Sequence, residues 1–69
     1  MNELVFEVIE DADGGYWAEC LTEPIFTQAD TWEQLRAETR DAVTAFFFDG
    51  KVPQQIRLHM VRNEILPTA

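Results

Sequence analysis

The sequence predicts an α+β domain of order βββαβ, with a mostly antiparallel four-stranded sheet and one helix on one of its faces. Three observations support this prediction. A single long helical stretch covers residues 30–50, short strand-like segments flank it on both sides, and turn-forming residues separate the first three of these segments. Because a chain of 69 residues can hold only one hydrophobic core, we expect a single domain over residues 1–69.

The first predicted strand covers residues 4–10, where successive side chains point to opposite faces. One face carries the apolar residues Leu4, Phe6 and Val8. The other face carries Val5, Glu7 and Ile9. The sequence DADGG at residues 11–15 then predicts a hairpin turn, because Gly14 and Gly15 can both adopt the positive φ angles that tight turns need.

The second predicted strand, residues 16–21, follows this turn directly. Its helix-facing side holds Tyr16, Ala18 and Cys20. Its other side holds Trp17, Glu19 and Leu21. Pro24 indicates a second turn over residues 22–24, and a short third strand is expected over residues 25–29. These three strands would form an antiparallel meander.

The helix has a clear start and a clear end in the sequence. Thr31 and Gln34 form a capping-box pattern, and Asp30 with Glu33 repeats it one residue earlier. Gly50 is expected to close the helix in a left-handed conformation. The residues at helical spacing that should face the sheet are Trp32, Leu35, Thr39, Ala42, Val43 and Phe46.

The last predicted strand covers residues 56–65. One face carries Ile56, Leu58 and Met60. The other face carries Arg57, His59 and Val61. A helix between the third and fourth strands allows the last strand to return parallel to the first by a right-handed crossover.

Several apolar side chains should remain outside the core and are candidates for an interface. Consecutive helical residues are about 100° apart, so Phe46, Phe47 and Phe48 cannot all face the sheet. The face without the helix would also expose apolar residues among its charges. The candidate interface residues are Val5, Ile9, Trp17, Phe47, Phe48 and Val61. Since small domains often need a disulfide, a metal or a partner subunit, we expect a homo-oligomer, either a dimer or a tetramer.

The charge of the chain limits its partners. Five basic and thirteen acidic residues give a net charge of −8, which disfavours nonspecific binding to nucleic acid phosphates. A basic protein partner would be attracted, although the same charge could serve only to keep a small protein in solution. No apolar run approaches the roughly 20 residues that span a bilayer, and we expect a cytoplasmic protein.

No set of side chains predicts catalysis. Glu7 and Glu19 could lie on adjacent strands, but a two-metal site needs more converging carboxylates. His59 has no serine to activate because the chain contains none, and the single cysteine, Cys20, is expected to be a buried apolar residue. We therefore expect a protein that is not an enzyme and that holds no cofactor and no metal.

Several short motifs occur in an order that resembles the HicB-like family of small antitoxin-type domains. They are a GGYWA hairpin strand, a turn with a proline, and a helix start that contains TQADTWEQL. The matching positions are Gly14, Gly15, Tyr16, Ala18, Pro24, Thr27, Ala29, Asp30, Thr31, Glu33 and Leu35. The resemblance covers residues 4–48 and implies a βββαβ sheet described as a partial ribonuclease H-like fold.

The resemblance also implies a function. HicB-like antitoxins commonly bind HicA, a small basic toxin that cleaves RNA, and many carry an additional DNA-binding module. Only four residues follow Ile65, so we expect no such module here, and Ile25 stands where the family pattern prefers glycine. Two alternatives remain open. The chain is either an antitoxin for a HicA-type toxin or an orphan homo-oligomer with a regulatory or structural role and no toxin partner.

Overall fold

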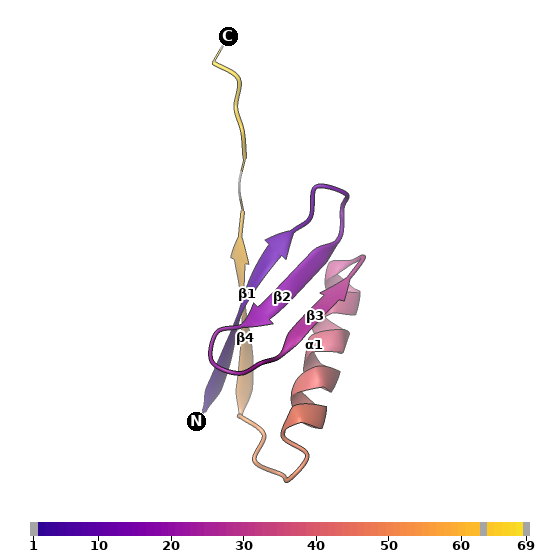
Figure 1. The fold of residues 1–69 in the computed structure, drawn as a ribbon, viewed down its shortest axis with the longest axis vertical. Helices are drawn as coiled ribbons and strands as arrows, with labels where there is room; N and C mark the ends of the chain where they lie inside the picture. Colours follow the sequence, from indigo (N-terminus) through magenta and orange to yellow (C-terminus); the bar gives the residue numbers. More distant parts are fainter. Residues whose placement is uncertain (1, 63, 69) are drawn as a thin grey trace.

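The computed structural model describes residues 2–62 and 64–68 and confirms the predicted fold class. The elements are β1 (Glu3–Glu10), β2 (Tyr16–Cys20), β3 (Phe26–Ala29), α1 (Trp32–Phe46) and β4 (Gln55–Val61). The strand order is β3-β2-β1-β4 (Figure 1). The pairs β1–β2 and β2–β3 are antiparallel, and β4 lies parallel to β1 as the crossover argument predicted.

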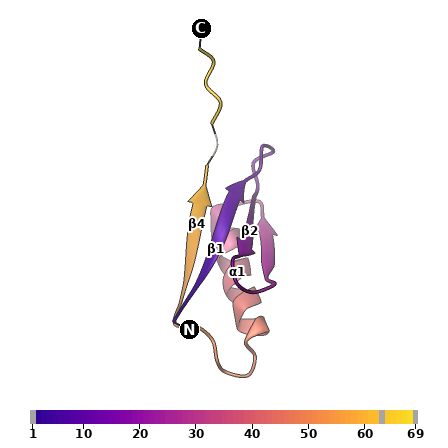
Figure 2. The same ribbon diagram turned by 60° about the vertical axis from the view of Figure 1, so that its left-hand side comes forward.

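The hydrophobic core lies between α1 and one face of the sheet (Figure 2). Alternation along β1 sends Leu4, Phe6 and Val8 into this layer, where all three are fully buried. Leu35 and Val43 fill it from α1. No helix of residues 2–62 and 64–68 covers the opposite face of the sheet (Figure 2), and we call this face the open face.

One polar contact joins the two layers inside the core. The hydroxyl groups of Thr27 on β3 and Thr39 on α1 are both buried and share a hydrogen bond of 2.9 Å. This contact satisfies both groups where water cannot reach them.

The start of α1 agrees with the sequence, but its end does not. Thr31 is the N-cap, and its hydroxyl accepts a hydrogen bond of 3.1 Å from the backbone N–H of Gln34. The helix ends at Phe46, because Phe47 leaves the helical region with φ −102° and ψ 47°. Gly50 does adopt a positive φ of 89°, but it lies in the turn that follows the helix. Its backbone N–H donates a hydrogen bond to the carbonyl of Phe47. The prediction that Gly50 closes the helix is therefore wrong.

This early end changes the roles of the three phenylalanines. Phe47 packs against the core, whereas Phe46, which was expected in the core, is 41% exposed. Their rings are in contact edge to face at 5.0 Å between centroids. Phe48 is exposed, as the angular argument required for at least one of the three.

The remaining differences are at turns and strand ends. Gly14 has a positive φ of 101°, but Gly15 does not, so the prediction for Gly15 is wrong. β3 begins at Phe26 rather than at residue 25, although Ile25 is buried and its carbonyl accepts from the N–H of Cys20. β4 ends at Val61, whereas the sequence predicted that this strand would continue to residue 65. Residue 63 of the predicted strand lies outside the described residues.

Candidate protein interface

The open face presents two complete rows of side chains across the four strands. Register places one row, from β3 to β4, as Gln28, Trp17, Ile9 and Val61. The next row is Phe26, Glu19, Glu7 and His59. Apolar and charged side chains are therefore mixed over one surface, and we treat this surface as a candidate interface.

The most exposed large apolar side chains of this face lie near β3. The rings of Trp17 and Phe26 stack at 5.7 Å between centroids with an interplanar angle of 30°. Phe26 is 57% exposed, and Leu21 beyond the end of β2 is 62% exposed. Large apolar side chains that stay in water at this level are candidates for burial against another protein.

The structure separates the six candidate interface residues into two groups. Val5, Ile9, Trp17 and Val61 are half-buried and lie on the open face. Phe47 and Phe48 follow α1, which covers the other face, and Phe47 packs against the core. The sequence analysis did not select Phe26, although alternation from the buried Thr27 places it on the open face.

Acidic residues occupy the middle of the open face. Glu7 and Glu19 are directly opposite each other, as predicted, and Glu7 also lies opposite His59 on β4. No group of three or more potential metal ligands occurs within residues 2–62 and 64–68. These acids are thus a source of surface charge, and a cation on a partner would neutralise them.

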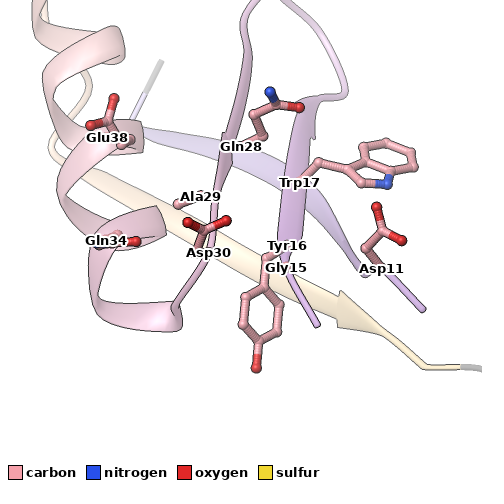
Figure 3. A pocket seen from close by; sticks show the side chains of 9 residues that line it. All are labelled: Asp11, Gly15, Tyr16, Trp17, Gln28, Ala29, Asp30, Gln34 and Glu38. Carbon is pink, nitrogen blue, oxygen red and sulfur yellow. The ribbon is translucent and has the colours of Figure 1, made fainter. Parts of the chain in front are cut away.

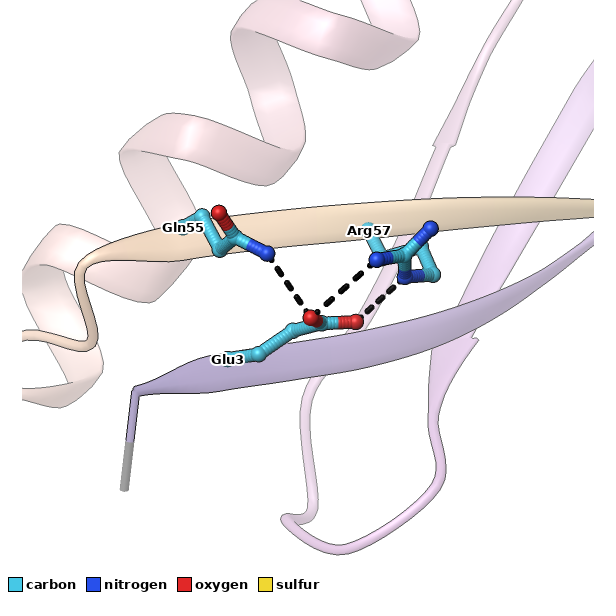
Figure 4. Close-up of polar contacts among 3 residues, drawn as sticks. All are labelled: Glu3, Gln55 and Arg57. Atoms are coloured by element: carbon cyan, nitrogen blue, oxygen red, sulfur yellow. Dashed lines mark hydrogen bonds and ion pairs between the residues drawn. The ribbon is translucent and has the colours of Figure 1, made fainter.

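A second feature of the open face is a network at its β1–β4 end (Figure 4). The Glu3 carboxylate accepts hydrogen bonds from the side chains of Arg57 and Gln55, the latter at 2.7 Å. The hydrogen bonds from Arg57 lower the pKa of Glu3, with a smaller contribution from Gln55. Sequence reasoning missed this network because Glu3 and Arg57 are far apart along the chain.

A hollow opens at the β2–β3 side, with a volume of about 510 Å³ (Figure 3). We call it the acidic hollow because Asp11, Asp30 and Glu38 supply its carboxylates, while Tyr16 and Trp17 supply aromatic rings. Carboxylates beside aromatic rings suit an arginine or lysine side chain. The three acids come from a turn, a strand end and a helix, and Figure 3 shows them spread around the hollow, with Asp11 beside Trp17 and Glu38 on α1.

A third concave feature is a groove between α1 and β4, with a volume of about 380 Å³. We call it the α1–β4 groove. Its apolar lining comes from Val43, Val52, Pro53, Ile56 and Leu58. Arg36 and Arg40 also line it, from α1.

The two side chains with possible reactivity lie on different faces of the sheet. Cys20 is buried, as predicted, and its sulfur lies 3.8 Å from the hydroxyl of Thr22. His59 is exposed on the open face opposite Glu7. No helix of the described ranges is long and apolar enough to cross a membrane.

The sequence has two informative relatives. A UPF0150 protein of Thermotoga maritima is 39% identical over 62 residues, which cover 90% of this chain and 87% of the relative. A UPF0150 protein of Archaeoglobus fulgidus is 40% identical over 50 residues, which cover 72% of this chain and 76% of the relative. No family model matches the sequence, and no solved structure matches it.

Proposed function

The chain belongs to the UPF0150 family, and from this premise we propose that it is a non-enzymatic, HicB-like protein that binds a small basic protein. The observation that carries the proposal is the composition of the open face. It combines the Trp17–Phe26 stack, in which Phe26 is exposed, with a pair of adjacent acids. The acidic hollow lies beside this face, at the β3 edge and next to α1. These are the apolar anchor and the electrostatic complement that a basic partner needs.

The charges of the open face favour a partner of a different kind over a second copy. Two copies that met through this face would bring Glu7 and Glu19 of each chain together, and four carboxylates in one interface would repel. A basic partner would instead place cations against Glu7 and Glu19, so its interface would not contain this repulsion. The HicB resemblance suggests that the partner is a HicA-type, RNA-cleaving toxin, which the chain would neutralise in the cytoplasm.

The test is co-purification of this chain with a small basic protein encoded beside it. We expect a complex at low salt that weakens as salt rises, because exposed charges are screened. Phe26→Ala should weaken the complex about tenfold if Phe26 is an anchor. Phe48→Ala removes an equally large exposed ring outside the open face and is the matched control. Binding that survives Phe26→Ala, or that ignores salt, would contradict the proposal.

The alternative is an orphan homo-oligomer without a toxin partner. The half-buried apolar residues Ile9, Trp17 and Val61, which share one row of the sheet, favour a chain that another copy covers. The solution mass separates the alternatives. A stable dimer or tetramer with no complex in the co-purification supports the orphan oligomer, and a monomer that binds the basic protein supports the first proposal.

A further inference from the structure

The α1–β4 groove has a composition that differs from the rest of the surface. Its apolar part is formed by Val43, Val52, Pro53, Ile56 and Leu58, and the uncharged polar residues Thr39, Thr44, Gln54 and Gln55 also line it. Val52 at its loop end is 43% exposed. Arg36 and Arg40 supply positive charge, in a chain with only five basic residues against thirteen acidic ones. Arg36 already pairs with Glu33 at 3.0 Å, whereas Arg40 has no ion pair with any described residue. An occupant of this groove should therefore be apolar and should carry a carboxylate.

The chain itself contains such an occupant. Residues 64–66 are Glu64, Ile65 and Leu66, and we call them the tail segment. Ile65 is 94% exposed and Leu66 is 71% exposed, which leaves two large apolar side chains in water beside an acid. Figure 1 shows the tail segment leaving the end of β4 and pointing away from the loop end of the groove.

The tail segment cannot fill the groove of its own chain by folding back along β4 as a hairpin. The tightest hairpin after Val61 has two loop residues, so it would place Ile65 opposite Met60 and Leu66 opposite His59. The groove residues Leu58, Ile56 and Val52 lie further back along the chain. A continuation of the hairpin would also meet Pro67, which has no N–H to donate.

Pairing with a second copy would place the tail segment beside the α1–β4 groove of that copy. β4 is an edge strand of the sheet, so its outer edge is free to pair with another strand. Antiparallel pairing of two β4 strands centred on His59 would place Glu64 and Leu66 on the same face as Ile56 and Leu58, whereas Ile65 would point to the open face. Glu64 would then lie opposite Gln54, and Leu66 would lie opposite Val52, of the second copy. Both are groove residues, and the two-fold symmetry of such a pair fills both grooves at once.

We infer that two copies of this chain associate through their β4 edges and that the tail segment of each copy fills the α1–β4 groove of the other. The acid of the tail segment would lie on the groove side with Arg40, which has no ion pair with any described residue, and Leu66 would cover Val52. This inference rests on the self-association proposed above, but it uses a surface other than the open face. A basic partner could therefore still bind the open face of each copy.

The first test measures the mass of the full chain across a dilution series. Ile65→Asp with Leu66→Asp should raise the dimer dissociation constant at least about tenfold, because charge replaces apolar contact. Ala12→Asp with Ala37→Asp adds the same charge at two exposed positions outside the groove and is the matched control. Circular dichroism checks that each variant keeps its fold. A tail variant that associates as the wild type does would overturn the inference.

The second test reverses the predicted ion pair. Arg40→Glu and Glu64→Arg should each weaken the dimer, and the double variant should restore it. Glu64→Arg alone is decisive, since it lowers the net negative charge and would strengthen any association limited only by general repulsion. Stronger association of this single variant would contradict tail docking.

Two further outcomes distinguish a failure of the inference from a failure of the proposed function. If Phe26→Ala dissociates the oligomer and the tail variant does not, self-association is correct but tail docking is wrong. If the wild-type chain is a monomer whose groove methyl signals from Val43 and Leu58 shift in the tail variant, the tail segment docks within one chain, and the second copy is excluded.

Discussion

Glu7 and Glu19 lie directly opposite each other on β1 and β2, in the middle of the open face. Like charges in this position destabilise an antiparallel pair. Glu7 has His59 on its other side, whereas Glu19 has Phe26. Glu19 thus lies between a like charge and the ring that we propose as an anchor. A cation from a partner at this point would relieve a cost that is already present in the free chain.

This arrangement predicts that Glu19→Gln stabilises the isolated protein. The free energy of unfolding should rise by about 0.2–1 kcal/mol, because the change removes the like charge opposite Glu7. Urea unfolding at low salt measures the gain, which should shrink as salt is added. Glu10→Gln is the control, since Glu10 faces the neutral Tyr16. The prediction is wrong if Glu10→Gln stabilises the chain as much as Glu19→Gln does.

The Glu3–Arg57 contact predicts a pH dependence at the acid end. Because Arg57 lowers the pKa of Glu3 below the ordinary value of 4.5, folding favours the charged carboxylate. The stability from this contact is present above the ordinary pKa and is lost as pH falls through the lowered one. The wild type should thus be more stable than Glu3→Gln at neutral pH, and the difference should vanish in acid.

Urea unfolding of both proteins from neutral pH to about pH 3 measures this difference. The control is Arg57→Gln, in which the pKa of Glu3 should return toward its ordinary value. A constant difference between wild type and Glu3→Gln over this range would contradict the prediction.

The buried Thr27–Thr39 hydrogen bond predicts strong coupling between β3 and α1. Thr39→Val leaves the Thr27 hydroxyl buried without a partner and should cost about 1–3 kcal/mol. Thr27→Val should cost a similar amount. The double variant replaces both hydroxyls with methyl groups of the same shape, so it should cost less than the sum of the two single changes.

A double-mutant cycle with urea unfolding measures this coupling. Thr44→Val is a control for the loss of a hydroxyl on α1, because Thr44 is exposed and only bonds to the carbonyl of Arg40. Purely additive costs at Thr27 and Thr39 would show that the hydrogen bond does not join the two layers.

Local patterns were sufficient to predict the order and the faces of the elements. Leu4, Phe6 and Val8 alternate without interruption, so their strand and its buried face could be read directly. The helix end was mispredicted because Phe46, Phe47 and Phe48 are equally apolar. Only the three-dimensional position of the core decides which of them it accepts, and the backbone leaves the helix to bury Phe47.

The open-face part of the candidate interface could be predicted in the same way. Val5, Ile9, Trp17 and Val61 follow from strand alternation, and register then joins the last three in one row. The acidic hollow and the Glu3–Arg57 contact could not be predicted. Each unites residues from separate elements, and their meeting depends on the register and on the crossover rather than on any local pattern.

The last prediction concerns the two glycines of the first hairpin, which are required for different reasons. Gly14 has a φ of 101°, so Gly14→Ala should cost about 1–2 kcal/mol of backbone strain. A Cβ at Gly15 would instead lie 3.2 Å from the carbonyl oxygen of Ala29 on β3, so Gly15→Ala should cost stability by crowding. Asparagine tolerates positive φ, and Gly14→Asn should therefore recover part of the loss at Gly14. Gly15→Asn should recover nothing, because any Cβ meets the same carbonyl. Thermal unfolding of the four variants separates the two causes, and equal recovery at both positions would refute this distinction.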